Sequence, residues 1–377
     1  MSNSELLIKN IAKVTNGKSD VKNATENGKY VFFDRSTVNK KSDRYLFDTE
    51  AIIIPGEDSR EIFEPRYFNG KFDLHQRCYV IYDFEKDFYP KYLFYKLKTL
   101  TKHFSNVFVG STVPSLRLDH ITDLKINFPS FEQQKVIASI LSALDSKIEL
   151  NNRLNIELES MAKTLYDYWF VQFDFPNNKG KPYKTSGGKM VWNEKLKREI
   201  PQGWEIKQIG DIFEVKRGKN ITRKTIQNGD IPVIAAGLEP SCYHNVSNTT
   251  APIITISGSG ANAGFIQLHN QNIWASDCSY IDISTTKYVY IIYLFLKNRQ
   301  KEIYDMQKGS AQPHVYPKDI MELEIISDPN FKIFDDFLEI IKPQFELIGK
   351  LKQENQQLSE LRDWLLPMLM NGQVTVK

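Results

Sequence analysis

The sequence has few cysteines and no long apolar run. Its three cysteines, Cys78, Cys242 and Cys278, lie far apart and form no CxxC pair, so neither a disulfide framework nor a cysteine-rich zinc site is expected. The longest strongly apolar run is VYIIYLFL at 289–296, much shorter than the roughly 20 residues of a membrane span. No signal-peptide pattern is recognisable. These absences predict a soluble, cytoplasmic protein that does not enter a membrane.

Common catalytic signatures are also missing. The chain has no phosphate-binding P-loop, no GxSxG nucleophile motif and no Pro-Asp dipeptide to begin the common nuclease carboxylate motif. DPNF at 328–331 lacks the second proline of the loop with which DNA amino-methyltransferases hold a flipped base. The six histidines are scattered, and Cys242 with His244 is too small a set for a metal site. We therefore predict binding without catalysis, with no catalytic residue and no metal ligand.

The charge balance and the length limit the possible partners and architecture. There are 49 Lys and Arg against 46 Asp and Glu, a formal net charge of +3, so any contact with nucleic acid must depend on local clusters. At 377 residues the chain exceeds one ordinary domain. Its 41% hydrophobic content can fill more than one core.

An internal repeat dominates the sequence. Four sets of positions match in the same order at offsets of 199 to 201 residues, and so constant an offset indicates a duplicated unit. The pairs are IKNIAKVTNGK at 8–18 with IGDIFEVKRGK at 209–219, Cys78 and Ile81 with Cys278 and Ile281, GSTVPSLRLDHITDLKI at 110–126 with GSAQPHVYPKDIMELEI at 309–325, and Ile148, Leu158, Met161 and Leu165 with Ile348, Leu358, Leu361 and Leu365. Each copy begins with a mixed stretch and ends with a helical one, which predicts the order globule, helix, globule, helix.

Each copy is expected to end in a long amphipathic helix. In the first copy Ser130 and Gln133 form a capping box after Pro129, and apolar residues follow in steps of three and four. Matching seams in both copies favour an antiparallel helix pair, although each helix could instead pack on its own globule. Polar residues within the seam are expected to fix its register. The predicted seam consists of Ile137, Leu141, Leu144, Ile148, Asn155, Leu158 and Leu165 in the first helix and Ile348, Leu351, Asn355, Leu358 and Leu365 in the second.

Local clusters of basic and small polar residues suit a DNA backbone. VKRGKNITRK at 215–224 holds five basic residues and no acid. SGSGANAG at 257–264 offers small polar side chains, although a flexible turn would explain it equally well. NGKFDLHQR at 69–77 contains residue types that contact phosphates and base edges. Any one of these residues also suits a solvated surface, but the candidates occupy comparable places in both copies. They are Lys71, His75, Gln76, Arg77, Lys102, Thr112, Lys216, Arg217, Lys219, Asn220, Arg223, Lys224, Ser257, Ser259, Asn262, Lys308, Ser310 and Gln312.

Four stretches carry a resemblance to a known family. They are FEQQKVIASILSALDSKIELNNRL at 131–154, LYDYWF at 165–170, IPQGWEIKQIGDIFEVKRGK at 200–219 and LRDWLLPMLMNGQV at 361–374. With them the chain resembles the specificity subunits of Type I restriction-modification systems. The resemblance implies two target-recognition domains, two conserved helical regions that pair antiparallel, and a bipartite DNA target with an unspecified gap. It also implies that the chain binds no cofactor. Modification subunits supply S-adenosylmethionine and adenine methylation, and restriction subunits supply ATP- and magnesium-dependent translocation and cleavage.

The resemblance also assigns roles to particular residues. The match at 200–219 implies that Pro201, Gly203 and Trp204 open the second recognition domain, a signature that the first domain lacks. The match at 361–374 implies that the apolar end of the second helix faces the modification subunits. We further expect this end to pack on the first globule. The predicted partner-binding residues are Trp169, Phe170, Trp364, Leu366 and Met368.

The resulting prediction is an α+β fold with two mixed α/β recognition domains, separated by two long helices that form an antiparallel coiled coil, and an internal pseudo-twofold repeat. The predicted boundaries are 1–129 for the first recognition domain, 130–175 for the first helical region, 176–199 for a linker, 200–329 for the second recognition domain and 330–377 for the second helical region. The predicted function is a non-catalytic DNA-reading subunit that binds two methyltransferase subunits. The alternatives are a self-contained DNA methyltransferase or nicking enzyme with diverged motifs, and a structural adaptor that binds protein.

Overall fold

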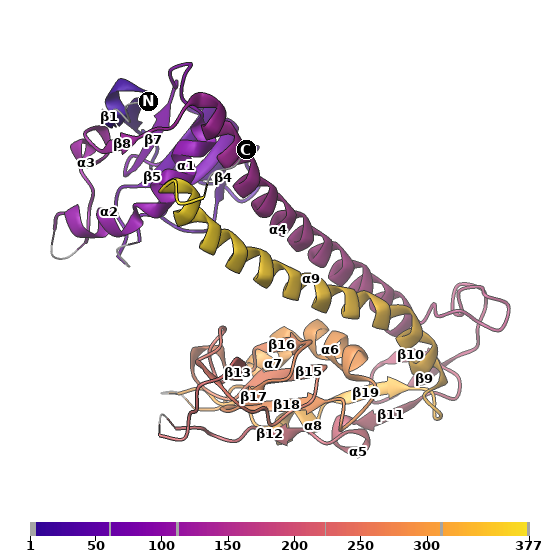
Figure 1. The fold of residues 1–377 in the computed structure, drawn as a ribbon. Coiled ribbons are helices and arrows are strands. Elements are labelled where there is room, and N and C mark those ends of the chain that lie inside the picture. Colours follow the sequence, from indigo (N-terminus) through magenta and orange to yellow (C-terminus); the bar gives the residue numbers. More distant parts are fainter. Residues whose placement is uncertain (1–4, 60–61, 111–112, 223, 310–311, 375–377) are drawn as a thin grey trace. The chain divides into compact units, whose positions relative to one another are not determined.

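The chain forms two compact units. The computed structural model describes residues 5–59, 62–110, 113–222, 224–309 and 312–374. Unit 1 consists of the residues up to Glu149 together with those from Asn355 onward, and unit 2 consists of Leu150–Glu354. Two long helices, α4 (Phe131–Tyr166) and α9 (Lys332–Met370), therefore each contribute one part to each unit (Figure 1).

Unit 1 is built on a six-stranded sheet in the order β2-β7-β5-β6-β3-β4. All neighbours are antiparallel except β3 and β6. The central strand β5 ends in an apolar run because both of its faces are buried: Ile52 and Ile54 face one core cluster, and Ala51 and Ile53 face another. The strands are β2 (Lys13–Asn16), β3 (Tyr30–Phe33), β4 (Lys40–Ser42), β5 (Phe47–Pro55), β6 (Arg66–Leu74) and β7 (Cys78–Tyr82).

The remaining elements of unit 1 cover this sheet. Helix α1 begins at Pro90, which suits the first turn of a helix because proline lacks an N–H. The other elements are η1 (Ile8–Asn10), η2 (Val21–Asn23), α1 (Pro90–Thr99), α2 (Thr101–Val107), α3 (Leu118–Thr122) and the antiparallel pair of β1 (Glu5–Leu7) and β8 (Lys125–Asn127).

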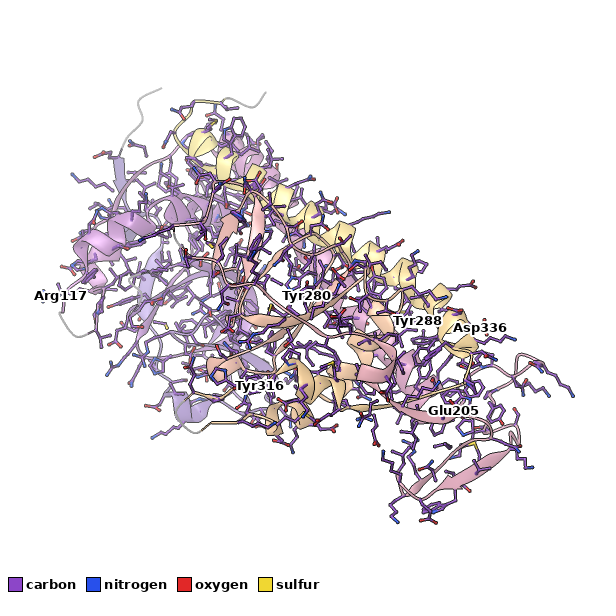
Figure 2. All side chains as sticks on the ribbon, turned by 90° about the horizontal axis from the view of Figure 1, so that it is seen from below. Arg117, Glu205, Tyr280, Tyr288, Tyr316 and Asp336 are labelled. Carbon is purple, nitrogen blue, oxygen red and sulfur yellow. The ribbon has the colours of Figure 1, made fainter. Side chains whose placement is uncertain are left out.

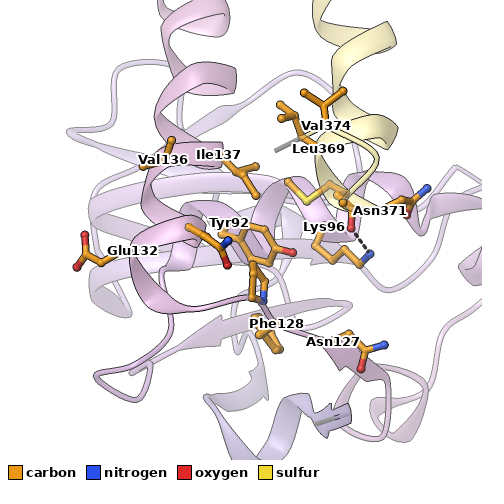
Figure 3. Close-up of a pocket in the computed structure, with 14 residues that line it drawn as sticks. Tyr92, Lys96, Asn127, Phe128, Glu132, Val136, Ile137, Leu369, Asn371 and Val374 are labelled. Carbon is orange, nitrogen blue, oxygen red and sulfur yellow. Dashed lines mark hydrogen bonds between the residues drawn. The ribbon is translucent and has the colours of Figure 1, made fainter. Parts of the chain in front are cut away.

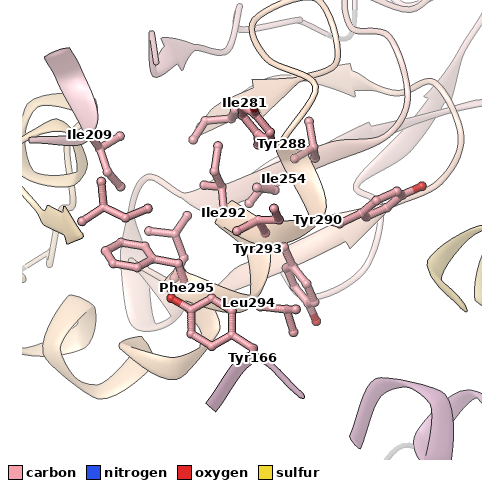
Figure 4. Packing of buried hydrophobic residues seen from close by; sticks show 14 of the residues in the cluster. Tyr166, Ile209, Ile254, Ile281, Tyr288, Tyr290, Ile292, Tyr293, Leu294 and Phe295 are labelled. Carbon is pink, nitrogen blue, oxygen red and sulfur yellow. The ribbon is translucent and has the colours of Figure 1, made fainter. Parts of the chain in front are cut away.

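Unit 2 contains smaller sheets around one large core. Their orders are β12-β18-β15-β16, β14-β13-β17, β10-β9 and β11-β19. The apolar run at 289–296 lies in helix α6, and all of its side chains are buried in this core (Figure 4). The strands are β9 (Met190–Asn193), β10 (Arg198–Pro201), β11 (Glu205–Gln208), β12 (Lys216–Arg217), β13 (Ile231–Ile234), β14 (Cys242–His244), β15 (Ile253–Ser257), β16 (Ile266–His269), β17 (Trp274–Ala275), β18 (Cys278–Asp282) and β19 (Glu324–Ser327). The helices before α9 are η3 (Asp167–Val171), α5 (Ile209–Ile212), η4 (Gly260–Asn262), α6 (Val289–Asn298), α7 (Gln300–Asp305) and α8 (Pro317–Met321).

The predicted internal repeat is visible in the order of the elements. Strand β1 pairs with β8 as β11 pairs with β19, and β2 pairs with β7 as β12 pairs with β18. In each copy two helices follow, then a short helix, a strand and a long helix. The α+β class and the duplication are therefore confirmed.

Within unit 1, the first part of α4 and the last part of α9 run antiparallel. Helix α4 begins with the predicted capping box, in which Gln133 N donates to Ser130 Oγ at 3.4 Å and Ser130 N donates to Gln133 Oε1 at 3.3 Å. Farther along, Arg362 Nη1 lies 2.9 Å from Asp145 Oδ1. The apolar end of α9 packs on the first globule as expected, because Leu369 and Met370 are buried in a cluster with Tyr92, Tyr95, Ile137, Ala138 and Leu141.

Within unit 2, the other parts of the same helices also run antiparallel. Asn151 is completely buried and donates from Nδ2 to Glu354 Oε2 at 2.7 Å. Farther along α4, the ring of Tyr166 lies 6.2 Å from that of Phe337 on α9. In both units the predicted seam residues lie buried or half-buried.

The segment predicted as a linker has regular structure in unit 2. Residues 176–199 include β9 and the start of β10, which form an antiparallel hairpin. Nearby, the ring of Phe175 stacks between those of Tyr183 and Trp204, with centroid distances of 4.7 and 5.1 Å. The domain boundaries themselves stay a prediction.

Candidate nucleic-acid interface

Backbone hydrogen bonds join four segments of unit 1 into one loop cluster. Gly17 N donates to Cys78 O at 3.0 Å, and Gly56 N donates to Arg77 O at 2.9 Å. Leu116 N then donates to Gly56 O at 2.8 Å. We define the first loop cluster as Gly17–Lys18, Gly56–Glu57, His75–Arg77 and the described residues of 109–115.

Unit 2 forms the same frame at the equivalent positions. Gly218 N donates to Cys278 O at 2.8 Å, Gly258 N donates to Asp277 O at 3.1 Å, and Val315 N donates to Gly258 O at 3.2 Å. We define the second loop cluster as Gly218–Lys219, Gly258–Ser259, Ser276–Asp277 and the described residues of 308–314.

The shared frame identifies which side chains are equivalent. Bridges join Glu57 to Ser115 in unit 1 and Ser259 to His314 in unit 2. The equivalent pairs are therefore Lys18 with Lys219, Glu57 with Ser259, Arg77 with Asp277, Val109 with Lys308 and Ser115 with His314. The backbone is kept while several side chains change in size or charge, as expected for two related surfaces that bind different ligands.

Both frames depend on a glycine that lies against the neighbouring turn. A Cβ atom at Gly17 would lie 2.2 Å from Leu74 O, and one at Gly218 would lie 2.1 Å from Ser276 O. Both obstructing atoms belong to the backbone, so no side-chain rotation relieves the overlap. This requirement explains why the glycine of the Gly-Lys pair recurs in the two copies.

Substitution of Gly218 by alanine should destabilise unit 2. We expect a loss of about 1–3 kcal/mol in the free energy of unfolding, measured by urea denaturation, because the added methyl group must displace backbone. Gly237→Ala is the matched control, since the nearest atom to its Cβ would be Glu239 O at 3.4 Å. Equal stabilities of the two variants would contradict this explanation of the frame.

Exposed basic residues lie at the second loop cluster and in the segment that runs through it. Arg217, Lys219, Asn220 and Lys224 are exposed. Trp274 Nε1 donates to Lys219 O at 2.8 Å and so holds this segment in place. The ring of Tyr316 (labelled in Figure 2) stacks on that of His314 in the second loop cluster, with the centroids 5.8 Å apart.

Lys216 differs from these neighbours. Its ammonium donates to Ser284 Oγ at 3.1 Å and lies 3.9 Å from a carboxylate oxygen of Asp282. Because successive residues of a strand point to opposite faces, Arg217 points away from this ion pair. Arg217 and Lys219 are therefore better placed than Lys216 to meet a phosphate.

Three predicted DNA-contacting side chains are buried and already bonded. Ser257 Oγ donates to Ala236 O at 2.9 Å, and Ser259 Oγ donates to Asp277 Oδ2. His75 Nδ1 accepts from Arg77 N at 3.1 Å, and the residue is 4% exposed. These three side chains therefore point into the protein and not outward as predicted. His75 stabilises its own turn, whereas Ser257 and Ser259 each bond a segment farther away in the sequence.

The other candidates, apart from Arg77, fall into three groups. Gln76, Gln312 and Lys308 belong to the loop clusters, and Lys308 Nζ lies 2.5 Å from Asp319 Oδ1. Three lie elsewhere: Lys71 on β6 near Asp48, Lys102 on α2 and Asn262 in η4. Thr112, Arg223 and Ser310 lie outside the described residues.

Two charged residues were not identified from the sequence: Glu57 in the first loop cluster and Arg35, which bonds to it. Glu57 Oε1 accepts from Arg77 Nη1 and Glu57 Oε2 accepts from Arg35 Nη1, each at 2.6 Å. Partial burial acts to raise the pKa of Glu57, but the hydrogen bonds and charges of the two arginines outweigh it, and the pKa lies below its ordinary value. No sequence motif links these residues, which are 20 and 22 positions apart.

No catalytic arrangement is evident in the described residues. Burial raises the pKa of Cys78 and of Cys278 to about 12, so neither thiol is a nucleophile at neutral pH. Among the described side chains, no three His, Cys, Asp or Glu residues are grouped so as to hold a metal ion. None of the described helices has the length and hydropathy needed to cross a membrane.

Unit 1 also contains a pocket of about 580 Å³ beside the end of α9 (Figure 3). Its charged lining residues are Lys96 and Glu132. Lys96 Nζ donates to Met370 O at 3.2 Å, so this lysine helps to hold the end of α9 in place. The pocket thus lies where the helix end meets the first globule.

The predicted partner-binding residues divide between core and surface. Trp169 and Phe170 are buried in the core of unit 2, so their assignment to an exposed partner surface is wrong. Trp364 on α9 is 55% exposed, and Leu366 and Met368 are half-buried. Only these last three are accessible to another subunit.

The chain thus contains two copies of one α+β domain. Each copy has a long helix and the same loop frame, but the side chains on the loops differ, which is the architecture of a protein with two recognition domains. The family described as Type I restriction modification DNA specificity domain matches residues 4–160 and again residues 201–358. The Type I restriction enzyme MjaIX specificity subunit of Methanocaldococcus jannaschii is 30% identical over 310 residues, which cover 76% of this chain and 69% of that protein. The HindI specificity subunit of Haemophilus influenzae is 24% identical over 424 residues, which cover 92% and 84%.

A solved structure shares the fold. The Type I restriction-modification S subunit from M. genitalium matches with a TM-score of 0.67 and 20% identity, over 97% of this chain and 95% of that one. The chain belongs to the Type I restriction-modification DNA specificity family. It is a specificity subunit without a catalytic site of its own, and the alternative of a self-contained methyltransferase or nicking enzyme receives no support.

Proposed function

We propose that this chain reads a bipartite target in double-stranded DNA, with one half-site for each loop cluster. The observation that carries the proposal is the duplicated loop frame, in which hydrogen-bonding positions are kept and side-chain chemistry changes. A shared frame with unlike side chains gives each copy its own pattern of donors and acceptors, which is what reading two different short sequences requires. The unspecified bases between the half-sites are spanned by the length of α4 and α9.

The chain acts within a larger cytoplasmic complex. It binds two modification subunits, which carry S-adenosylmethionine and methylate DNA, and restriction subunits join to supply ATP- and magnesium-dependent cleavage. Exposed Trp364, with half-buried Met368 about one turn farther along α9, supports a subunit-binding surface in unit 1, because large exposed apolar side chains are typical of interfaces. Leu366 also belongs to the predicted surface, but it packs partly against the cluster that contains Tyr92 and Ile137. We propose the domain boundaries predicted from the sequence: recognition domains at 1–129 and 200–329, helical regions at 130–175 and 330–377, and the segment 176–199 between them.

Replacing both Arg217 and Lys219 by alanine should weaken DNA binding for all sequences. If each residue neutralises one phosphate, the negative slope of log K against log salt should become shallower by about 1.8, since each phosphate contact contributes about −0.9 to it. The measurement is a salt titration of DNA affinity with the assembled complex. Lys195→Ala with Lys197→Ala is the control, as both lysines are exposed and lie outside the loop clusters.

Two outcomes would count against this assignment. An unchanged slope in the Arg217 and Lys219 variant would remove these residues from the interface. If the unaltered complex bound DNA without any salt dependence, the reading of this chain as a DNA-binding subunit would fail, and a protein-binding adaptor would be favoured instead.

A further inference from the structure

At the first loop cluster, one carboxylate holds two arginines. Arg77 and Arg35 each donate one Nη1–H to Glu57, to different carboxylate oxygens and at the same distance of 2.6 Å. The arginine side chains are 54% and 43% exposed, whereas that of Glu57 is 16% exposed. The Glu57 side chain is therefore largely covered, and about half of each arginine side chain faces solvent.

The loop that carries Arg35 is itself well anchored. Arg66 Nη1 donates to Ser36 O at 2.9 Å, and its Nη2 donates to Asp34 O. Ser36 N donates to Asp34 Oδ1 at 2.8 Å, which closes a turn around Arg35. Burial lowers the pKa of Arg66 from its ordinary value, although the group stays charged at neutral pH. Arg35 is thus fixed through its backbone as well as through its side chain.

The fold does not need this charged group in order to form the loop frame. The positions equivalent to Glu57 and Arg77 are Ser259 and Asp277, and the backbone bonds of the frame are the same in both units. Ser259 Oγ bonds Asp277 there, so an uncharged donor takes the place of the ion pair. A merely structural role would leave unexplained why unit 1 uses two arginines and a carboxylate at this place.

We infer that Arg77 and Arg35 read guanine in the half-site contacted by unit 1, and that Glu57 is the positioning residue that aims them. This inference rests on the proposed function. A guanidinium has five N–H donors in a planar fork, so one bond to Glu57 leaves enough donors for O6 and N7 of guanine in the major groove. Holding both side chains in advance reduces the entropy lost on binding.

A phosphate contact is the main competing role, and lysine substitution separates the two. Lysine keeps the positive charge but lacks the planar fork needed for a bidentate contact. Arg77→Lys should therefore leave the affinity for DNA without the target nearly unchanged, because the charge is kept. It should lower the affinity for the guanine-containing target and so relax the guanine requirement at one position. The expected loss of discrimination is about 5- to 150-fold, which corresponds to the roughly 1–3 kcal/mol of a bidentate contact.

The test uses the complete chain expressed with its modification subunits in a host without other methylation. Sequencing of methylated bases gives the recognised motif for the unaltered chain and for Arg77→Lys, Arg35→Lys and Glu57→Gln. Lys13→Ala is the control: Lys13 also pairs with a carboxylate, Asp83 at 2.7 Å, but it lies opposite Tyr82, at the far end of β7 from Cys78. In all three test variants the requirement for guanine should be relaxed in one half-site only. The control should keep the full motif.

The outcomes distinguish this inference from the function on which it rests. If the unaltered chain yields a bipartite motif and Arg77→Lys yields the same motif, the inference is wrong and the proposed function stands. If the unaltered chain yields no bipartite motif, the proposed function itself fails. Relaxation by Glu57→Gln without loss of methylation at the other half-site would confirm the positioning role, because general unfolding would reduce methylation at every site.

Discussion

Deleting four residues from each long helix is expected to move methylation to targets whose gap is about two base pairs shorter. The deletion removes Asn151–Leu154 from α4 and Leu351–Glu354 from α9, residues that lie within continuous helix. Four residues span about 6 Å of helix, compared with about 3.4 Å per base pair of DNA. Removing four residues rotates the rest of each helix by about 400°, close to a full turn. Asn155 and Asn355 therefore take the seam positions that Asn151 and Leu351 held. The predicted seam from Ile148 to Trp169, about 33 Å long and close to one DNA turn, would shorten accordingly.

The appropriate control deletes two residues from each helix. Removing Asn152–Arg153 and Lys352–Gln353 turns the following seam by about 200°, so apolar residues move to the outer face and the assembly should be lost. Motif sequencing of the methylated sites measures both variants. If the four-residue deletion kept the original gap at full methylation, helix length would not set the spacing.

Replacing Phe337 by alanine should cost unit 2 much of its stability. Phe337 is completely buried on α9, and its ring lies 5.1 Å from Trp169 and 5.0 Å from Phe170. Truncation of such a residue typically costs about 3–5 kcal/mol, a large share of the roughly 5–15 kcal/mol that stabilises a folded domain. Urea denaturation followed by tryptophan fluorescence is suitable, because Trp169 lies in the affected cluster.

Leu347→Ala provides the comparison on the same helix. Leu347 is 44% exposed, so its truncation should change the free energy of unfolding by less than about 1 kcal/mol. Similar losses in the two variants would show that the aromatic cluster does not anchor α9 in unit 2.

The architecture could be predicted from the sequence because its signals are local or periodic. A constant offset identified the duplication, Ser130 and Gln133 marked the start of α4, and apolar spacing marked the seam. The family model independently matches two stretches with nearly the same offset, at 4–160 and 201–358.

The candidate site was less predictable because burial depends on distant neighbours. Ser257 looked like an exposed loop hydroxyl, but Ala236, 21 positions earlier, accepts its hydrogen bond. Trp169 and Phe170 looked suited to a partner because sequence alone does not show that aromatic residues of α9 cover them. Glu57 and Arg35 were missed for the same reason, since only the folded chain brings them to Arg77.

The division of the chain between its two units has a consequence for folding during synthesis. Unit 2 is one continuous segment, Leu150–Glu354, whereas unit 1 needs residues from Asn355 onward as well. Leu369 and Met370 therefore reach Tyr92 and Ile137 only after unit 2 has left the ribosome. Until then the apolar face that they cover has no native partner. A chain that stops before Asn355 would keep every residue of unit 2, yet it would leave unit 1 with this face uncovered and prone to aggregation.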